Sequence, residues 1–384
     1  MTTGTSQSAT AQTGTAQTGT STLDDEELEA LRDTVREVCA DAGGTTAVRE
    51  LDESGRGYDE RLWRVLAQEV GLAGLGLPEP YGVGGLAELA VVCEELGRVL
   101  APVPFLGSTV LAGQVLARCG PLATTALKDV AEGRVHALAV ADADGVWRPE
   151  GLAVTAHPAV NGWRLTGMSP FVLDGTGATG FVVAATGPDG VDVFTVAAGA
   201  PGVTAQPTPC LDLSRSQAML LLDDTPAIRV TVGGTGAAAV TEGLDLALVA
   251  LSAEQLGGAQ ACLDMTVAYT CERTQFGRAI GSFQAVKHRC ADMLLQVETA
   301  RSAVLRGVAV EDDPPALAEA AAVAQSWCCE AYTWVAEETV QLHGGIGFTW
   351  EHDAHLYFRR AVADAALLGG SAHHREQLAR LLGW

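Results

Sequence analysis

The sequence predicts an α+β fold, mainly α, with helical segments at both ends of the chain and a β-rich segment between them. Apolar residues recur at helical spacing up to about residue 130 and again from about residue 237. Between them, short β-rich runs alternate with Gly, Pro and Asp at intervals of about ten residues. The chain is 48% apolar and only 18% charged, so it can bury large cores.

The N-terminal region divides into a tail and a helical domain. Residues 1–22 are low in complexity and repeat AQTGT, so we expect a disordered tail that is neither a signal nor a transit peptide. Four helical patterns predict an N-terminal helical domain over residues 23–130. They begin near Thr22, Tyr58, Leu86 and Thr109.

The middle and the end of the chain differ in periodicity. The runs HALAVA, WRLTG, FVVAAT, VDVFTV, AMLLLDD and IRVTV predict a β-sandwich or barrel over residues 131–232. Residues 233–384 return to helical spacing, with patterns over 240–272, from Val286 onward and over 316–340. Long helices with apolar stripes predict an antiparallel bundle, an architecture that often forms oligomers.

Charge and cysteine usage exclude several classes of protein. The net charge of −23 repels nucleic acid and anionic membrane surfaces, so neither is an expected partner. The sequence contains no apolar run of about 18 residues, so we expect no membrane span. Nine cysteines without a CxxC pair indicate buried thiols in a reducing, cytoplasmic setting.

Two segments carry residues suited to binding a nucleotide. YTCERTQFGRAIGSFQAVKHR, residues 269–289, places four basic side chains, two glycines and Phe276 in a turn before a helix. Bare amides and arginine at such a turn suit a pyrophosphate or an adenylate, although a loop with solvated charges would also explain them. QLHGGIGF, residues 341–348, follows a long helix, and its glycines indicate either a helix cap or a close approach to a diphosphate.

Together, in this order and at this distance, the two segments resemble the acyl-CoA dehydrogenase family. The family shows ERxxFGxxI…FQ followed by QxxGGxG, and the similarity continues through WEHDAHLYFRRAVAD. The resemblance implies an N-terminal helical domain, a middle β domain, a C-terminal four-helix bundle and FAD as cofactor. It also implies an acyl-CoA substrate, from which a carboxylate takes the α-proton while the flavin takes the β-hydride.

By the same resemblance, one subunit holds the flavin ring and its neighbour contacts the adenylate and pyrophosphate. The residues that would contact FAD in this way are Arg273, Gln275, Phe276, Gln284, Gln341, Gly344 and Gly345.

The catalytic carboxylate of the family is absent from both of its usual positions. Ala247 and Gly369 occupy them, so we expect no catalytic residue in this chain. Glu254, two helical turns further along the long helix, is the acid that could replace the missing base. The alternative is that Glu254 only packs against partners. We expect no metal site, because the adjacent His373 and His374 would point about 100° apart at a solvated helix start.

The β domain departs from the family on the flavin side. The loop that lines the flavin reads ADADG at 141–145, Phe171 replaces a shielding Trp, and Leu173 replaces a Thr that bonds near flavin N5. Losing that polar contact weakens the binding of a flavin there by about 1 kcal/mol or more.

The losses fall on one half of the site, and the retained residues fall on the other. In this the chain resembles the β-type subunit of actinobacterial α2β2 acyl-CoA dehydrogenases of steroid side-chain degradation. The hypothesis is a subunit that completes the FAD site of a paralogous partner holding the catalytic Glu, with an electron-transfer flavoprotein as a possible acceptor. The alternatives are a self-sufficient homotetramer that uses Glu254 and a non-redox acyl-CoA-binding or scaffold protein.

Overall fold

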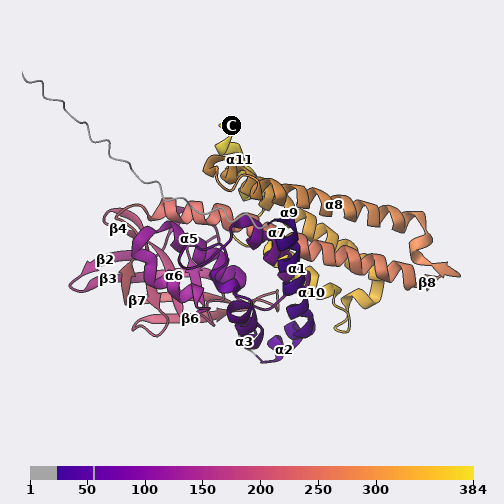
Figure 1. Cartoon of the computed structure of the whole chain (residues 1–384), viewed down its shortest axis with the longest axis horizontal. Helices are drawn as coiled ribbons and strands as arrows, with labels where there is room; N and C mark the ends of the chain where they lie inside the picture. Colours follow the sequence, from indigo (N-terminus) through magenta and orange to yellow (C-terminus); the bar gives the residue numbers. More distant parts are fainter. Residues whose placement is uncertain (1–23, 55–56) are drawn as a thin grey trace, which may run out of the picture.

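The computed structural model describes residues 24–54 and 57–384, so the tail predicted over residues 1–22 lies outside the described residues. Helices precede and follow a single barrel of strands, and this order confirms the predicted fold class (Figure 1). The barrel and the far end of the long helices lie at opposite ends of the molecule.

Helices α1 to α6 precede the barrel. An Asp24–Glu27 capping box starts the first of them, since the side chain of each residue accepts from the backbone N–H of the other. The pattern predicted from Thr109 begins earlier, as a π-helical segment over Phe105–Ala112 that continues into α5. The helices are α1 (Asp25–Asp41), α2 (Thr46–Ser54), α3 (Glu60–Arg64), α4 (Leu86–Arg98), α5 (Gly113–Arg118) and α6 (Thr124–Ala131).

The β domain closes on itself. β4 pairs with both β2 and β5, and β7 pairs with β3 and β5, so the strands form a ring with β1 and β6 added at its sides. Its own apolar core includes Leu165, Phe181 and Phe194. The strands are β1 (His136–Ala139), β2 (Thr155–Ala159), β3 (Gly162–Leu173), β4 (Gly180–Gly187), β5 (Gly190–Ala197), β6 (Val203–Thr208) and β7 (Gln217–Arg229).

The C-terminal helices pack around α7 (Gly236–Glu272), which at 1.5 Å per residue is about 55 Å long. This helix is long and apolar enough to cross a membrane, but 78% of its most apolar window is buried, as in the core helix of a bundle. Its neighbours include α4 and α9. The remaining helices are α8 (Gln284–Val308), α9 (Pro314–His343), α10 (Ala354–Asp364) and α11 (Ser371–Leu381).

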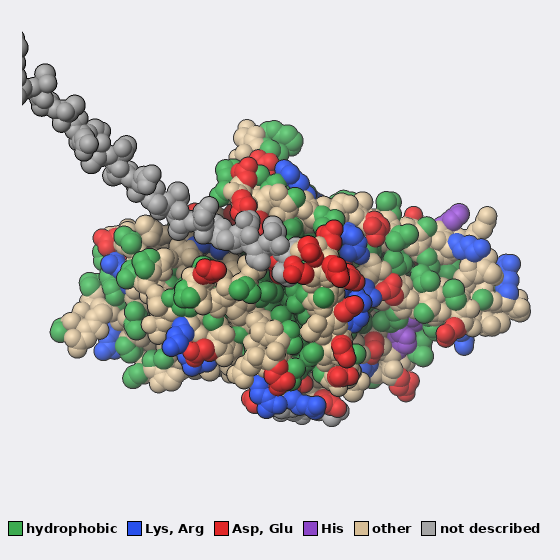
Figure 2. Space-filling view, viewed as in Figure 1, with side chains coloured by type: hydrophobic (Ala, Val, Ile, Leu, Met, Phe, Trp, Pro, Cys, Tyr) green, Lys and Arg blue, Asp and Glu red, His purple; other side chains and the backbone are tan. Residues whose placement is uncertain are grey.

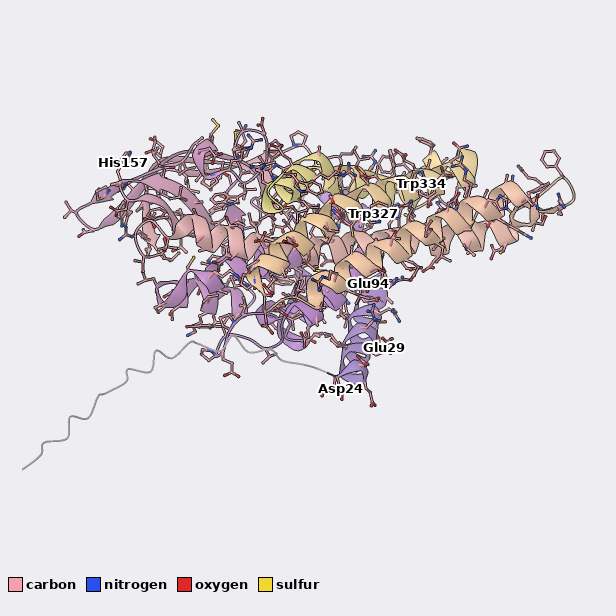
Figure 3. All side chains as sticks on the ribbon, turned by 90° about the horizontal axis from the view of Figure 1, so that it is seen from above. Asp24, Glu29, Glu94, His157, Trp327 and Trp334 are labelled. Carbon is pink, nitrogen blue, oxygen red and sulfur yellow. The ribbon has the colours of Figure 1, made fainter. Side chains whose placement is uncertain are left out.

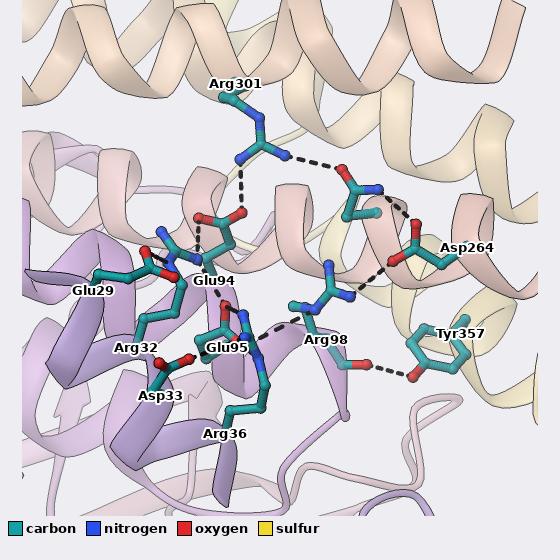
Figure 4. Close-up of polar contacts among 11 residues, drawn as sticks. Glu29, Arg32, Asp33, Arg36, Glu94, Glu95, Arg98, Asp264, Arg301 and Tyr357 are labelled. Atoms are coloured by element: carbon teal, nitrogen blue, oxygen red, sulfur yellow. Dashed lines mark hydrogen bonds and ion pairs between the residues drawn. The ribbon is translucent and has the colours of Figure 1, made fainter. Parts of the chain in front are cut away.

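A network of charges joins the N-terminal helices to this bundle (Figure 4). Glu95 of α4 is 2% exposed and accepts from Arg32 and Arg36 of α1 at 2.7 and 3.0 Å. Its neighbour Glu94 accepts from Arg301 of α8 at 2.8 Å. Three helices from both ends of the chain are thereby held to one another.

Seen from above, α7 and α8 extend beyond the rest of the molecule as a pair (Figure 3). Trp327 and Trp334 lie along the bundle, and His157 of β2 lies at the opposite end. The first segment predicted to bind nucleotide connects α7 to α8 at this projecting end.

Candidate functional site

A short hairpin joins α7 to α8. β8 (Thr274–Gln275) pairs with β9 (Arg278–Ala279), and the two residues between them, Phe276 and Gly277, have φ of +51° and +78°. Two positive φ values are the geometry of a type I′ turn, which suits the twist of a two-stranded hairpin. The Phe276 ring is 90% exposed as a result.

Backbone hydrogen bonds hold the base of this hairpin. Arg273 donates its N–H to the carbonyl of Tyr269 at 2.8 Å and accepts the N–H of Ile280 at 2.8 Å. The guanidinium of Arg278 lies 3.9 Å from the centre of the Phe283 ring, and Gln284 begins α8 as an exposed residue.

The second predicted segment ends α9 at the same end of the bundle. Gly344 has φ +64° and ψ −140°, a conformation that side chains strongly disfavour. A Cβ added to Gly344 or Gly345 would meet no atom within 4 Å, so this stretch of backbone is open. Gln341 and both glycines are exposed.

We call the hairpin residues 273–284 and the turn residues 341–345 the tip. All seven residues predicted to contact FAD lie in it: Arg273, Gln275, Phe276, Gln284, Gln341, Gly344 and Gly345. Basic side chains also gather over this end of an otherwise acidic surface (Figure 2). An exposed cationic surface with bare glycine backbone suits a phosphate-bearing ligand.

A cavity of about 320 Å³ lies between the barrel and α10. Phe171 and Leu173, the residues that replace flavin contacts in the resemblance, both line it. A β-bulge between Ser169 and Val172 leaves Phe171 at φ +56° and turns its ring toward Gly145 of the ADADG loop. We call this space the barrel cavity.

Six ionisable side chains form a cluster beside the barrel cavity, and three of them, Asp212, Arg215 and Asp364, line it. Arg215 donates to Glu254 and to Asp364, and Arg360 donates to Glu254 and forms an ion pair with Asp212 at 2.5 Å. Asp174 lies close enough to Arg215 to interact with it electrostatically. This ionic cluster joins the barrel to the C-terminal helices and contains Asp174, Asp212, Arg215, Glu254, Arg360 and Asp364.

The ionic cluster holds four acids against two guanidinium groups. Burial raises the pKa of Asp174 and of Asp364 to about 7. Burial opposes the ionisation of Asp212 too, but Arg360 and Arg215 hold its pKa below the ordinary value. Each of these two carboxyl groups is therefore partly protonated near neutral pH, which reduces the excess of negative charge.

Neither expected position of the catalytic base carries a proton acceptor. Ala247 is fully buried in α7, and Gly369 has φ +98° in the segment between α10 and α11. Glu254, the proposed replacement, forms ion pairs with Arg215 and Arg360. The interpretation of Glu254 as a residue that packs against partners agrees with this geometry.

A second cavity, of about 250 Å³, lies beside Gly369 and contains an acid that the sequence did not single out. Asp245 lines it together with Leu248 and Leu368, and burial raises the pKa of Asp245 to about 6. Its only sequence signal was an acid among apolar residues of a buried helix. We call this space the helix cavity.

His374 also lines the helix cavity, and its predicted solvation is wrong. The side chain is 1% exposed, and burial lowers its pKa to about 4. α11 starts three residues earlier, at Ser371, and packs against α9. Within residues 24–54 and 57–384, no group of three His, Cys, Asp or Glu residues is arranged to hold a metal ion.

Comparison with known proteins decides the family. The acyl-CoA dehydrogenase N-terminal domain matches residues 25–132, and the acyl-CoA dehydrogenase C-terminal domain matches residues 234–383. The chain is 40% identical to acyl-CoA dehydrogenase IpdE2 of Mycolicibacterium smegmatis, over 93% of this chain and 98% of that protein. The chain belongs to the acyl-CoA dehydrogenase family.

Two solved structures share both sequence and fold with this acyl-CoA dehydrogenase family member. The Tcur3481-Tcur3483 steroid ACAD is 36% identical, with a TM-score of 0.83 over 93% of this chain and 98% of that one. The ChsE4-ChsE5 complex from Mycobacterium tuberculosis is 32% identical, with a TM-score of 0.84 over 94% of this chain and 98% of that one.

Acyl-CoA dehydrogenases are FAD-dependent flavoproteins, and the two ends of this chain suit different parts of that cofactor. The tip offers guanidinium groups, an exposed aromatic ring and open glycine backbone, which fit a nucleotide diphosphate. The barrel cavity instead presents the carboxyl groups of Asp144, Asp212 and Asp364, and both terminal nitrogens of Arg215 are already engaged. The lining therefore offers few free side-chain donors, chiefly Gln217, to the acceptor-rich edge of a flavin ring.

Proposed function

We propose that this chain is a subunit of a heteromeric FAD-dependent acyl-CoA dehydrogenase and completes the cofactor site of a paralogous partner. The observation that carries the proposal is the division between the two regions. The tip keeps every residue type expected at the nucleotide, whereas the barrel and helix cavities lack the expected base and the polar flavin contact.

The distance between the two regions supports this division. Arg273, the residue directly after α7, lies 19 residues beyond Glu254, which is about 28 Å along the helix axis. The tip also projects away from the barrel (Figure 1). A nucleotide bound at the tip would therefore extend toward a neighbouring subunit.

Each tip residue has a specific role in this proposal. The Arg273 guanidinium pairs with the diphosphate, the Phe276 ring stacks on the nucleotide, and the amides of Gly344 and Gly345 approach the phosphates. Gln275, Gln284 and Gln341 supply neutral hydrogen bonds around them. When bound, the flavin accepts a hydride from the acyl chain, while the partner provides the carboxylate.

The names of similar structures support a steroid substrate and a paralogous partner chain. One similar structure is described as a steroid ACAD and another as a complex of two different chains. We therefore assign this subunit to dehydrogenation of the CoA thioester of a steroid side chain, with an α2β2 assembly. The electron acceptor assigned to the complex is an electron-transfer flavoprotein.

Purification alone and with a partner tests the proposal. We expect the lone chain to hold little flavin and to show no turnover. Co-expression with a paralogue that carries the catalytic Glu should restore both the flavin absorbance and activity. Full flavin occupancy and turnover by the lone chain would refute the proposal, and a complex that never contains flavin would instead indicate a scaffold.

Asp245 supports a second candidate, a self-sufficient enzyme with a displaced base. It is the buried acid that lines the helix cavity, and its pKa of about 6 suits proton abstraction near neutral pH. In that case Asp245→Asn would abolish turnover while flavin stays bound. Under the heteromer proposal the same substitution leaves the turnover number of the complex within a factor of two.

A further inference from the structure

Three aromatic rings from different segments lie against one another where the two parts of the tip meet. The ring of Tyr269, in the last turn of α7, lies 4.3 Å from that of His343, the last residue of α9, at an interplanar angle of 27°. The ring of His352 lies 4.4 Å from that of His343 on a tilted approach. The sequence identified the glycines beside His343 but gave no role to its side chain.

Hydrogen bonds fix the state of both histidines. Nδ1 of His343 lies 2.7 Å from the carbonyl oxygen of Thr339, which can only accept, so this nitrogen carries the proton. Nδ1 of His352 accepts the N–H of Ala354 at 3.1 Å, which places its proton on Nε2. Tyr269 adds a direct link between the helices, because its hydroxyl donates to the His343 carbonyl at 3.4 Å.

The stack connects the two halves of the tip. Tyr269 accepts, through its carbonyl, the backbone N–H of Arg273, where the hairpin begins. His343 immediately precedes Gly344, where the glycine turn begins. We propose that Tyr269 and His343 are positioning residues that hold the Arg273–Phe276 hairpin against the Gln341–Gly345 turn, so that both segments contact one nucleotide. This inference rests on the proposed function.

The surroundings of the stack require uncharged rings. Burial lowers the pKa of His343 and of His352. The charged groups nearby are Asp353, beside His352, and Arg49 of α2, which forms an ion pair with Asp353 at 2.7 Å. Nε2 of His343 is buried and has no hydrogen-bond partner, so a proton added there would be a buried charge without an acceptor. Acidification therefore favours separation of the two segments and weakens nucleotide binding.

Substitutions of His343 in the purified heteromeric complex test the inference, with FAD affinity measured by flavin fluorescence at pH 7.5 and 5.5. We expect His343→Ala to weaken FAD binding at least tenfold at pH 7.5. His343→Phe keeps a flat ring that cannot be protonated, so it should bind FAD within threefold of wild type and lose most of the pH dependence. The matched control is His157→Phe, on an exposed residue of β2 at the opposite end of the molecule, which should behave as wild type at both values.

The outcomes separate this inference from the function on which it rests. A wild-type complex without FAD would overturn the proposed function, and the inference with it. A wild-type complex with FAD, whose affinity is the same in His343→Ala, would overturn the inference alone. His343→Phe covers the case in which the Ala variant fails to fold, because retention of the full pH dependence by this variant would contradict the assigned role of the ring.

Discussion

At the scale of single residues, Glu254 shows how a plausible base becomes a structural group. Its carboxylate accepts from two arginines, one from the barrel and one from α10, and its side chain is 8% exposed. A carboxylate engaged in this way by two buried arginines is not free to approach a substrate. Its contribution is to hold the barrel against the bundle.

Replacing Glu254 with Gln should therefore affect stability and not catalysis. The amide keeps an acceptor for the arginines but loses the charge, so we expect the free energy of unfolding to fall by about 1–3 kcal/mol. Turnover of the complex per bound flavin should stay unchanged. Urea denaturation and steady-state kinetics measure the two quantities, and Glu319→Gln, on an exposed position of α9, is the control. Loss of turnover in a folded Glu254→Gln complex would contradict this interpretation.

The sequence could not have predicted these partners. Arg215 lies 39 residues before Glu254, and Arg360 lies 106 residues after it, so only the tertiary fold brings them together. The burial of Asp245 and of His374 was not predicted for the same reason, since it depends on helices that are distant along the chain. Residues whose role depends on local geometry, such as Gly344 in its turn, were identified correctly as positions of special backbone.

At the scale of elements, local patterns predicted the long helices and the strands β1, β3, β4 and β5. They missed the short elements β2, β6, α2 and α6, and the runs AMLLLDD and IRVTV overlap one strand, β7. The hairpin after α7 and the glycine turn after α9 follow from sequence signals in their own segments. The π-helical stretch over Phe105–Ala112 and the bulge that turns Phe171 follow from packing, for which the sequence carries no periodic signal.

The glycine turn provides an element-scale prediction. Gly344→Ala places a side chain at φ +64°, so we expect the free energy of unfolding to fall by about 1–3 kcal/mol. Gly345→Ala is the matched control, because this neighbour is not in the positive-φ region and has the same open surroundings. Thermal unfolding of both variants without added cofactor gives the comparison. Equal stability of the two variants would show that the turn is not held in this conformation.

At the scale of the whole molecule, the ionic cluster links stability to pH. Asp174 and Asp364 have folded-state pKa values of about 7, far above the ordinary aspartate value of 3.8. At these two groups the folded state binds protons more tightly than the unfolded state, so their contribution to stability is greatest at low pH and falls as pH rises from about 4 to about 7.

We therefore expect these two groups to make the chain less stable at pH 8 than at pH 5, as measured by urea midpoints. Asp174→Asn removes one of them, so this variant should show a weaker loss of stability over the same range. A variant with the full wild-type pH dependence would exclude Asp174 as a contributor.

The account as a whole depends on a division of labour between the two ends of the chain. Flavin content per complex, measured for two variants of this chain with an unmodified partner, tests that division most directly. We predict that Arg273→Ala, at the tip, removes most of the flavin and the activity. Phe171→Ala, in the barrel cavity, should leave both at the wild-type level. The reverse pattern, with flavin lost from the Phe171 variant and kept by the Arg273 variant, would contradict the account.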